Sequence, residues 1–357
     1  MKNMFRVFGR VGAASLLLAL GLNLSSVTSS DAATGELYAA GYFSAGIFDS
    51  APGFTDGTFI ADYAGISAPR GGLVLGSNFW ISDNAYNFTK LTFDPAIGIA
   101  EPHTPPPANV FDVLLNLAKP GQPAFDAARS VIYMPSAQTK TGGVYRSFYT
   151  AGLDTGSFSL PVQLAPGAGL DGPRPNAVAL GPDGQLYVGF QSTGDIRRIN
   201  NPAGITQTVQ TIGKSSKGGQ VYGLAFVGND LYLAEKNGFS VIHNATACNS
   251  GCSATLMPHS IVGQSHLGIA TDGVDTIYVA TNNSIMRYTL STQSQVLFAN
   301  SGALPDRTIV PFMMAGQMTA TVLDAAGNLW VSDDTSGGVD RFHGRLWVIP
   351  AGSGPVQ

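Results

Sequence analysis

The sequence has few charged residues and no concentration of basic ones. Lysine, arginine, aspartate and glutamate make up 12% of its 357 residues, and the formal net charge is −4; soluble proteins usually carry about 25% charged residues. A protein that binds nucleic acid needs a basic surface to meet the phosphates, so we expect no nucleic-acid partner. The chain also has no Gly-x-Ser-x-Gly elbow, His-Glu-x-x-His pair or Walker loop. Common sequence signs of hydrolases, metalloproteases and nucleotide-binding proteins are therefore missing.

Helical patterns and long apolar runs are also missing. No segment beyond residue 32 repeats apolar side chains at helical spacing, and 44 glycines and 21 prolines interrupt the chain. The apolar run 11–24 follows Lys2, Arg6 and Arg10 and is shorter than the roughly 20 residues that span a membrane. We therefore expect residues 1–32 to be a cleaved signal peptide rather than a transmembrane anchor. Residues 33–357 are expected to form one domain that is secreted or periplasmic, monomeric and without a membrane span.

Cysteine is scarce as well. The sequence contains two, Cys248 and Cys252, separated by Asn-Ser-Gly. A metal site or a redox pair is one interpretation, but two thiols alone supply too few ligands for the first. We expect a structural disulfide formed in an oxidising compartment, which would fasten an excursion of the chain.

The main feature of the sequence is one short segment that is repeated along the chain. In the copy at 176–199, two short apolar runs are joined by the turn Pro182-Asp183-Gly184, and a third run follows a second turn. An aromatic residue in the second run marks each copy, and these markers are Trp80, Tyr133, Tyr187, Tyr232, Tyr278 and Trp330, with a partial copy at Tyr38. A spacing of roughly 40–50 residues between short-stranded units is typical of a β-propeller.

We therefore predict an all-β fold, a single β-propeller of four-stranded antiparallel blades. Six full copies plus the strands around Tyr38 suit seven blades slightly better than six. Strands from both ends of the repeat region would pool to close the ring and protect its edges.

The copy at Tyr187 resembles those of known propeller families. Pro175-Asn176-Ala177-Val178-Ala179, followed by 182–188, is similar to the blade phrase of NHL-type and SMP-30/gluconolactonase-like propellers, and of virginiamycin B lyase-like ones. The lactonase-like members hold one divalent metal on Glu, Asn and Asp residues at the channel mouth. This resemblance implies Asn176 and Asp333 as ligands of Ca²⁺ or a similar cation. It leaves the family's glutamate without a counterpart, because the nearby Glu36 precedes a second strand rather than a first.

The repeat also predicts which polar side chains share one rim. In a propeller, the start of every first strand and the end of every second strand lie on the same face, around the central channel. Aligning the copies places there Arg70, Asp83, Asn176, Tyr222, Glu235, His266 and Asp333. Asp83 and Asp333 have an alternative role, since an aspartate after a strand often caps the following turn.

Two functions fit these observations. The first is a ligand- or protein-binding module without catalysis, whose partner is a small molecule or protein at the channel face. The alternative is a metal-dependent hydrolase of the lactonase kind or a lyase. In the lyase, His266 would act as general base with Glu235, from the preceding blade, as its partner. The methionine-rich stretch 306–318 is either inter-blade packing or a contact patch for an apolar partner.

Overall fold

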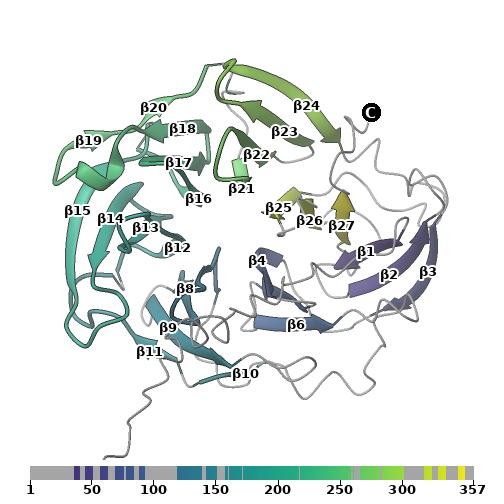
Figure 1. Cartoon of the computed structure of the whole chain (residues 1–357), viewed down its shortest axis with the longest axis horizontal. Coiled ribbons are helices and arrows are strands. Elements are labelled where there is room, and N and C mark those ends of the chain that lie inside the picture. The colour runs from purple at the N-terminus through teal and green to yellow at the C-terminus, as the bar shows by residue number, and fades with distance from the viewer. Residues whose placement is uncertain are drawn as a thin grey trace, which may run out of the picture.

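The computed structural model is a ring of β-sheets around a centre (Figure 1). It describes residues 119–138, 142–150, 157–159, 161–170, 172–216, 218–258, 260, 266–281 and 284–300, and the strands β1–β6 and β25–β27. In this part of the chain no helix is long and apolar enough to cross a membrane. Residues 1–32 and 306–316 lie outside it, so the signal peptide and most of the methionine-rich stretch stay predictions.

The strands follow one another in chain order. The first sheets contain β1 (Glu36–Ala40), β2 (Ala45–Ser50) and β3 (Gly57–Asp62); β4 (Pro69–Leu75), β5 (Asn78–Asp83) and β6 (Phe88–Thr92); and β7 (Ala124–Asp126), β8 (Val131–Ser136), β9 (Gly143–Thr150), β10 (Ser157–Phe158) and β11 (Val162–Gln163). Next come β12 (Pro175–Leu180), β13 (Leu186–Phe190), β14 (Asp195–Asn200) and β15 (Thr208–Lys214), then β16 (Val221–Val227), β17 (Asp230–Glu235), β18 (Gly238–Ile242), the 3₁₀ turn η2 (Ala245–Ala247), β19 (Cys252–Ser253) and β20 (Thr255–Leu256). The last sheets contain β21 (His266–Thr271), β22 (Thr276–Thr281), β23 (Ser284–Thr289) and β24 (Ser294–Asn300), and β25 (Gln317–Leu323), β26 (Leu329–Asp334) and β27 (Arg345–Ile349).

Each marker aromatic lies in the second strand of a sheet, as the repeat predicts. We name these sheets the Trp80, Tyr133, Tyr187, Tyr232, Tyr278 and Trp330 blades. The strands within a blade pair in antiparallel order, and the Tyr232 and Tyr278 blades each have four strands. The predicted all-β propeller with four-stranded blades is therefore confirmed.

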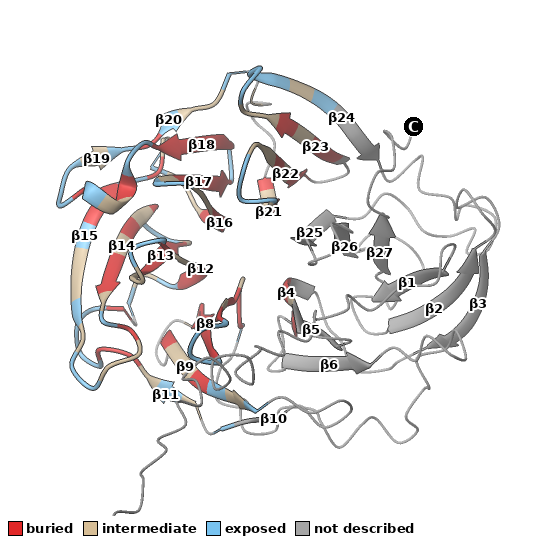
Figure 2. Ribbon diagram, in the orientation of Figure 1, coloured by how far each residue is buried: buried red, intermediate tan, exposed pale blue. Residues whose placement is uncertain are grey.

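The hydrophobic core lies between neighbouring blades. Buried residues run through β8, β13 and β17 (Figure 2). One core cluster joins Tyr187 and Ile196 to Leu224 and Leu233, and so fills the space between the Tyr187 and Tyr232 blades. A short blade has no core of its own, so burial between blades supplies the hydrophobic stabilisation.

The way the ring closes bears on the blade number. β25 contacts both β21 and β4, while β1 lies beside β27 (Figure 1). The β1–β3 sheet thus continues the Trp330 blade outward instead of standing between β25 and β4. Tyr38 accordingly lies beyond the third strand of that blade, not in the second-strand role that the partial copy predicts. The choice between seven and six blades stays a prediction, and the contact between β25 and β4 favours six.

Candidate functional site

The first two strands of five blades pair with the same irregularity. In the Tyr187 blade, Pro175 pairs with Phe190 and Ala177 with Gly189, so Asn176 lies in a β-bulge. The same shift places in equivalent bulges Arg70, Tyr222, Leu267 and Thr319. A bulge leaves one residue unpaired and redirects its side chain, and it recurs next to binding sites. The predicted rim therefore has a repeated backbone geometry.

The residue before each bulge pairs with the residue three positions after the marker aromatic. These pairs are Pro69–Asp83, Pro175–Phe190, Val221–Glu235, His266–Thr281 and Met318–Asp333. Asp83, Glu235 and Asp333 thus occupy one register on the same face of the ring. The side chains of Arg70, Asp83 and Asp333 lie outside the described residues, so their part in a site stays a prediction.

Asn176 is buried at its bulge, with 3% of its surface exposed. Its amide nitrogen Nδ2 donates to the carbonyl of Val221 in the next blade, at 3.1 Å. Its amide oxygen Oδ1 is also buried, and nothing in the described part of the chain donates to it. The bond from Nδ2 fixes the amide plane, so Oδ1 is held as an unsatisfied acceptor.

Tyr222 occupies the bulge one blade further on. It is half-buried, and its hydroxyl donates to the side-chain oxygen Oε1 of Gln220. This bond keeps the phenol at the end of β16 where the chain enters the blade, close in sequence to Val221, which accepts from Asn176. The two predicted rim residues are thus linked through the backbone of one strand.

Glu235 lies inside the protein and is fully buried. Its carboxylate accepts from the backbone nitrogen of Ser216 at 3.0 Å, from the Ser216 hydroxyl at 2.9 Å, and from the hydroxyl of Ser240. No ion pair among the described residues includes it. Three neutral donors therefore compensate for the desolvation of the charge. The contact anchors the chain entering the Tyr232 blade to β17 and β18.

His266 is also buried, with 1% of its surface exposed, and it pairs with the fully buried Thr281. Its strand, β21, contacts β16 and β17 of the Tyr232 blade, which puts His266 and Glu235 in neighbouring blades, as the lyase hypothesis requires. The described hydrogen bonds of Glu235 go to serines. The catalytic pairing of His266 with Glu235 stays a prediction.

A metal site has partial support from the geometry. Among the described side chains, no three His, Cys, Asp or Glu residues gather closely enough to hold a metal ion. Asn176 fits one oxygen ligand, because Oδ1 is buried and lacks a donor. The Asp333 side chain lies outside the described part, so the divalent cation stays a prediction.

Gln122 is the residue of this region that the sequence analysis missed. Its side-chain Nε2 donates to the carbonyl of Leu224 at 2.8 Å, and the Leu224 amide donates to its Oε1 at 3.0 Å. No motif surrounds it. A signal was present in Gly71 and Gly223, because glycines within inner strands indicate close approach of another part of the chain.

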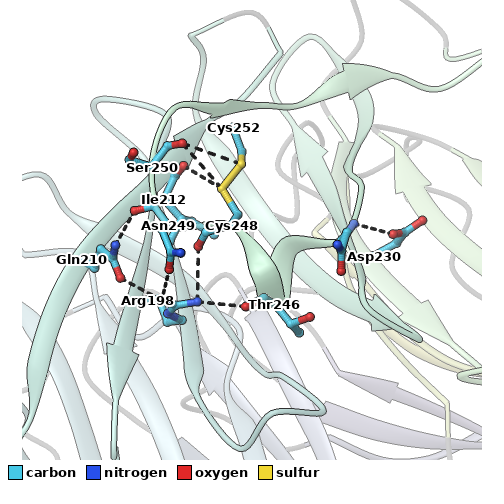
Figure 3. The surroundings of a disulfide bond; sticks show 10 residues. Arg198, Gln210, Ile212, Asp230, Thr246, Cys248, Asn249, Ser250 and Cys252 are labelled. Carbon is cyan, nitrogen blue, oxygen red and sulfur yellow. Dashed lines mark hydrogen bonds between the residues drawn. A yellow bond between two sulfur atoms is a disulfide. The ribbon is translucent and has the colours of Figure 1, made fainter.

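The disulfide prediction is confirmed. Cys248 and Cys252 are joined, with their Cα atoms 6.4 Å apart (Figure 3). The buried Arg198 of the Tyr187 blade donates to the carbonyls of Thr246 and Cys248, at 3.1 and 3.3 Å, and to Oδ1 of Asn249. β19 then pairs in parallel with β15. The disulfide loop of one blade is thus fastened to the outer edge of its neighbour.

Comparison with known proteins supports the fold. The sequence matches no protein-family profile, and no curated protein is a significant relative. A structural-genomics protein of unknown function from Bacteroides thetaiotaomicron VPI-5482 is similar at a TM-score of 0.55 and 13% identity, covering 86% of this chain and 82% of that one. A glucose dehydrogenase is similar at 0.53 and 13%, covering 80% and 97%. The extracellular domain of a hybrid two-component system from B. thetaiotaomicron is similar at 0.53 and 13%, covering 90% and 38%. The chain is a β-propeller, and at these identities the likeness concerns the fold alone.

Proposed function

We propose that this protein is an exported β-propeller that binds a ligand at the mouth of its channel, without catalysis. The mouth is the face where the bulges of the first strands lie. Export is supported by the predicted signal peptide and by the disulfide, since such bonds persist in oxidising compartments.

The buried amide oxygen of Asn176 carries this proposal. Leaving a buried acceptor unsatisfied costs about 1–3 kcal/mol, and native proteins rarely retain such a group without a purpose. The cost is recovered when a donor reaches Oδ1. The ligand therefore presents either a cation or an N–H or O–H group to Asn176.

The alternative function is a metal-dependent hydrolase or lyase with its site at the same mouth. The observation that favours it is the burial of His266 one position before a bulge, where a general base would face the channel. Against it stand the serine donors that occupy the Glu235 carboxylate. We retain the binding module as the main proposal for this reason.

A thermal-shift screen tests the proposal. Mature protein is heated with Ca²⁺, Mg²⁺, Mn²⁺ and Zn²⁺, and separately with a library of small amines, amides and polyols. A ligand of the native state at 100 times its Kd adds about 2.7 kcal/mol of stability, and Asn176→Ala should abolish that gain.

The matched control is Asn200→Ala, since Asn200 ends β14 at the opposite end of the blade and bonds only to Thr208 among the described contacts. Its variant should respond to the ligand as the wild type does. If no cation and no library compound stabilises the wild type more than Asn176→Ala, the proposal fails. Stabilisation by a cation with turnover of a lactone would establish the enzyme instead.

A further inference from the structure

Gln122 connects three blades. Its backbone nitrogen donates to the carbonyl of Asn176 at 2.9 Å, and its own carbonyl accepts from Val178 at 3.1 Å. These bonds join it to β12, the neighbouring inner strand. Its side chain continues past β12 to the backbone of Leu224 in β16. One residue thus spans from the Tyr133 blade to the Tyr232 blade, with the Tyr187 blade between them.

This contact runs along the channel side of β12, because Gln122 pairs with the edge of β12 that faces away from β13. The inner strands surround the centre of the ring, with β12 contacting β16 and β16 contacting β21 (Figure 1). A side chain that skips one inner strand has to pass on its channel side. β16 is the end strand of its sheet and pairs only with β17, so the Leu224 groups point to the unpaired edge. The amide of Gln122 supplies the donor and the acceptor that this edge needs.

Packing around Gln122 leaves no room for a side chain at Gly71 or at Gly223. A Cβ at Gly71 would lie 2.6 Å from the Cα of Gln122 and 2.9 Å from the carbonyl oxygen of Gly121. A Cβ at Gly223 would lie 3.0 Å from Oε1 of Gln122 and 2.8 Å from Ile269. Parts of four consecutive blades, from the Trp80 to the Tyr232 blade, therefore lie close to Gln122, and Ile269 of the Tyr278 blade lies close to Gly223.

We propose that Gln122 closes the channel and forms the floor of the ligand site. Leu224 lies two residues beyond the bulge residue Tyr222, which is about 7 Å deeper along the strand. A ligand at the mouth therefore enters and leaves by one face. It is a small molecule or a projecting chain end, and not a chain threaded through the ring. This ligand class rests on the proposed function, whereas the closure does not.

Hydrogen exchange at the Leu224 amide tests, without any ligand, the contact on which the closure depends. In mature protein, Gln122→Ala removes the only described acceptor of that amide, and its exchange should accelerate at least 100-fold. Amides of β17 should keep their wild-type rates. Gln185→Ala is the matched control, because Gln185 accepts from the Asn201 backbone in the same way but lies on the outside; it should leave Leu224 unchanged.

Gln122→Met keeps the test decisive if the alanine variant does not fold. Methionine fills similar space but cannot accept the bond, so Leu224 should again exchange rapidly in a native fold. Unchanged exchange of Leu224 in a folded Gln122 variant overturns the proposal. A failed ligand screen at Asn176 would leave the closure standing, and a failed exchange test would leave the screen result standing, so the two ideas are separable.

Discussion

Arg146 of the Tyr133 blade donates to the carbonyl of Pro202, in the next blade, across 2.9 Å. Arg146 lies directly opposite the marker Tyr133 in the strand pairing. Arg198 lies opposite Tyr187 in the same way and reaches the Thr246 carbonyl of the blade after. Both arginines thus hold the loop that follows the third strand of the next blade. The same device thus ties the Tyr133 blade to the Tyr187 blade and the Tyr187 blade to the Tyr232 blade.

Arg146→Ala should destabilise the protein by about 1–3 kcal/mol, because the carbonyls of Pro202 and Gly204 lose a charged donor. Urea unfolding followed by circular dichroism measures the change. Lys214→Ala is the control, since the Lys214 side chain is largely exposed and makes only a 3.7 Å ion pair with Asp195, which should contribute about 0–1 kcal/mol. Equal losses of stability from the two substitutions would contradict the role of Arg146 in tying the two blades together.

Glu235→Gln should lower stability by about 1–3 kcal/mol. The new amide can keep its oxygen on the Ser216 backbone nitrogen and the Ser240 hydroxyl and donate to the Ser216 hydroxyl, so the loss comes from replacing charge-assisted hydrogen bonds by neutral ones. Urea unfolding is the measurement, with Ser240→Ala as a milder comparison. A Glu235→Gln protein of wild-type stability that has lost a lactonase or lyase activity would favour the catalytic role.

Stability should fall as the pH rises from about 10 to 12. Burial is the main cause that raises the pKa of Tyr133, Tyr187 and Tyr232 to about 12, while in an unfolded chain a tyrosine has a pKa near 10. Between these values the unfolded state has released protons that the folded state keeps, so unfolding becomes easier. Urea midpoints at pH 8, 10 and 11 would show the decline.

Tyr133→Phe should reduce that alkaline loss with little effect at pH 7. Its hydroxyl is buried, and no hydrogen-bond partner for it lies in the described part of the chain. Tyr187→Phe, by comparison, loses a 2.9 Å bond to Asp183 and should be less stable at pH 7 by about 0.5–1.5 kcal/mol. If the stability of wild type and of Tyr133→Phe fell equally between pH 8 and 11, Tyr133 would not contribute to the alkaline loss.

Removing the disulfide should cost about 2 kcal/mol, the entropy of closing so short a loop. The double variant Cys248→Ser/Cys252→Ser and the wild type in dithiothreitol should unfold at the same urea concentration, below that of the oxidised protein. The reductant should have no effect on the variant. A reductant effect that persists there would mean that another process is responsible.

The sequence predicted what is local to a blade. Turn residues and alternating apolar runs specify hairpins, so the marker aromatics and the shared register of Asp83, Glu235 and Asp333 were accessible from the repeat. Asn176 was predicted as a site residue because the segment around it resembles that of known propeller families. The structure adds an independent observation, since the Oδ1 atom of Asn176 is buried and no described group donates to it.

Contacts between blades were not accessible in this way. Whether Gln122 reaches Leu224, or Arg146 reaches Pro202, depends on the relative orientation of the blades that carry them. The repeated segment specifies the strands of one blade and does not specify that orientation. The serines around Glu235 come from the inter-blade connection and the third strand, which lie outside the aligned part of the copies. The position of the β1–β3 sheet depends on a contact between strands far apart in the chain.

The parallel pairing of β19 with β15 has an evolutionary consequence. Gly213 pairs with Cys252, and a Cβ at Gly213 would fall 1.8 Å from the Cys252 carbonyl oxygen. The last strand of the Tyr187 blade, β19, is thus supplied by the chain segment that follows β18 of the Tyr232 blade. Duplicating or deleting one of these blades alone would leave β15 bare, and a bare edge invites aggregation. Rearrangements that preserve solubility must carry both blades together.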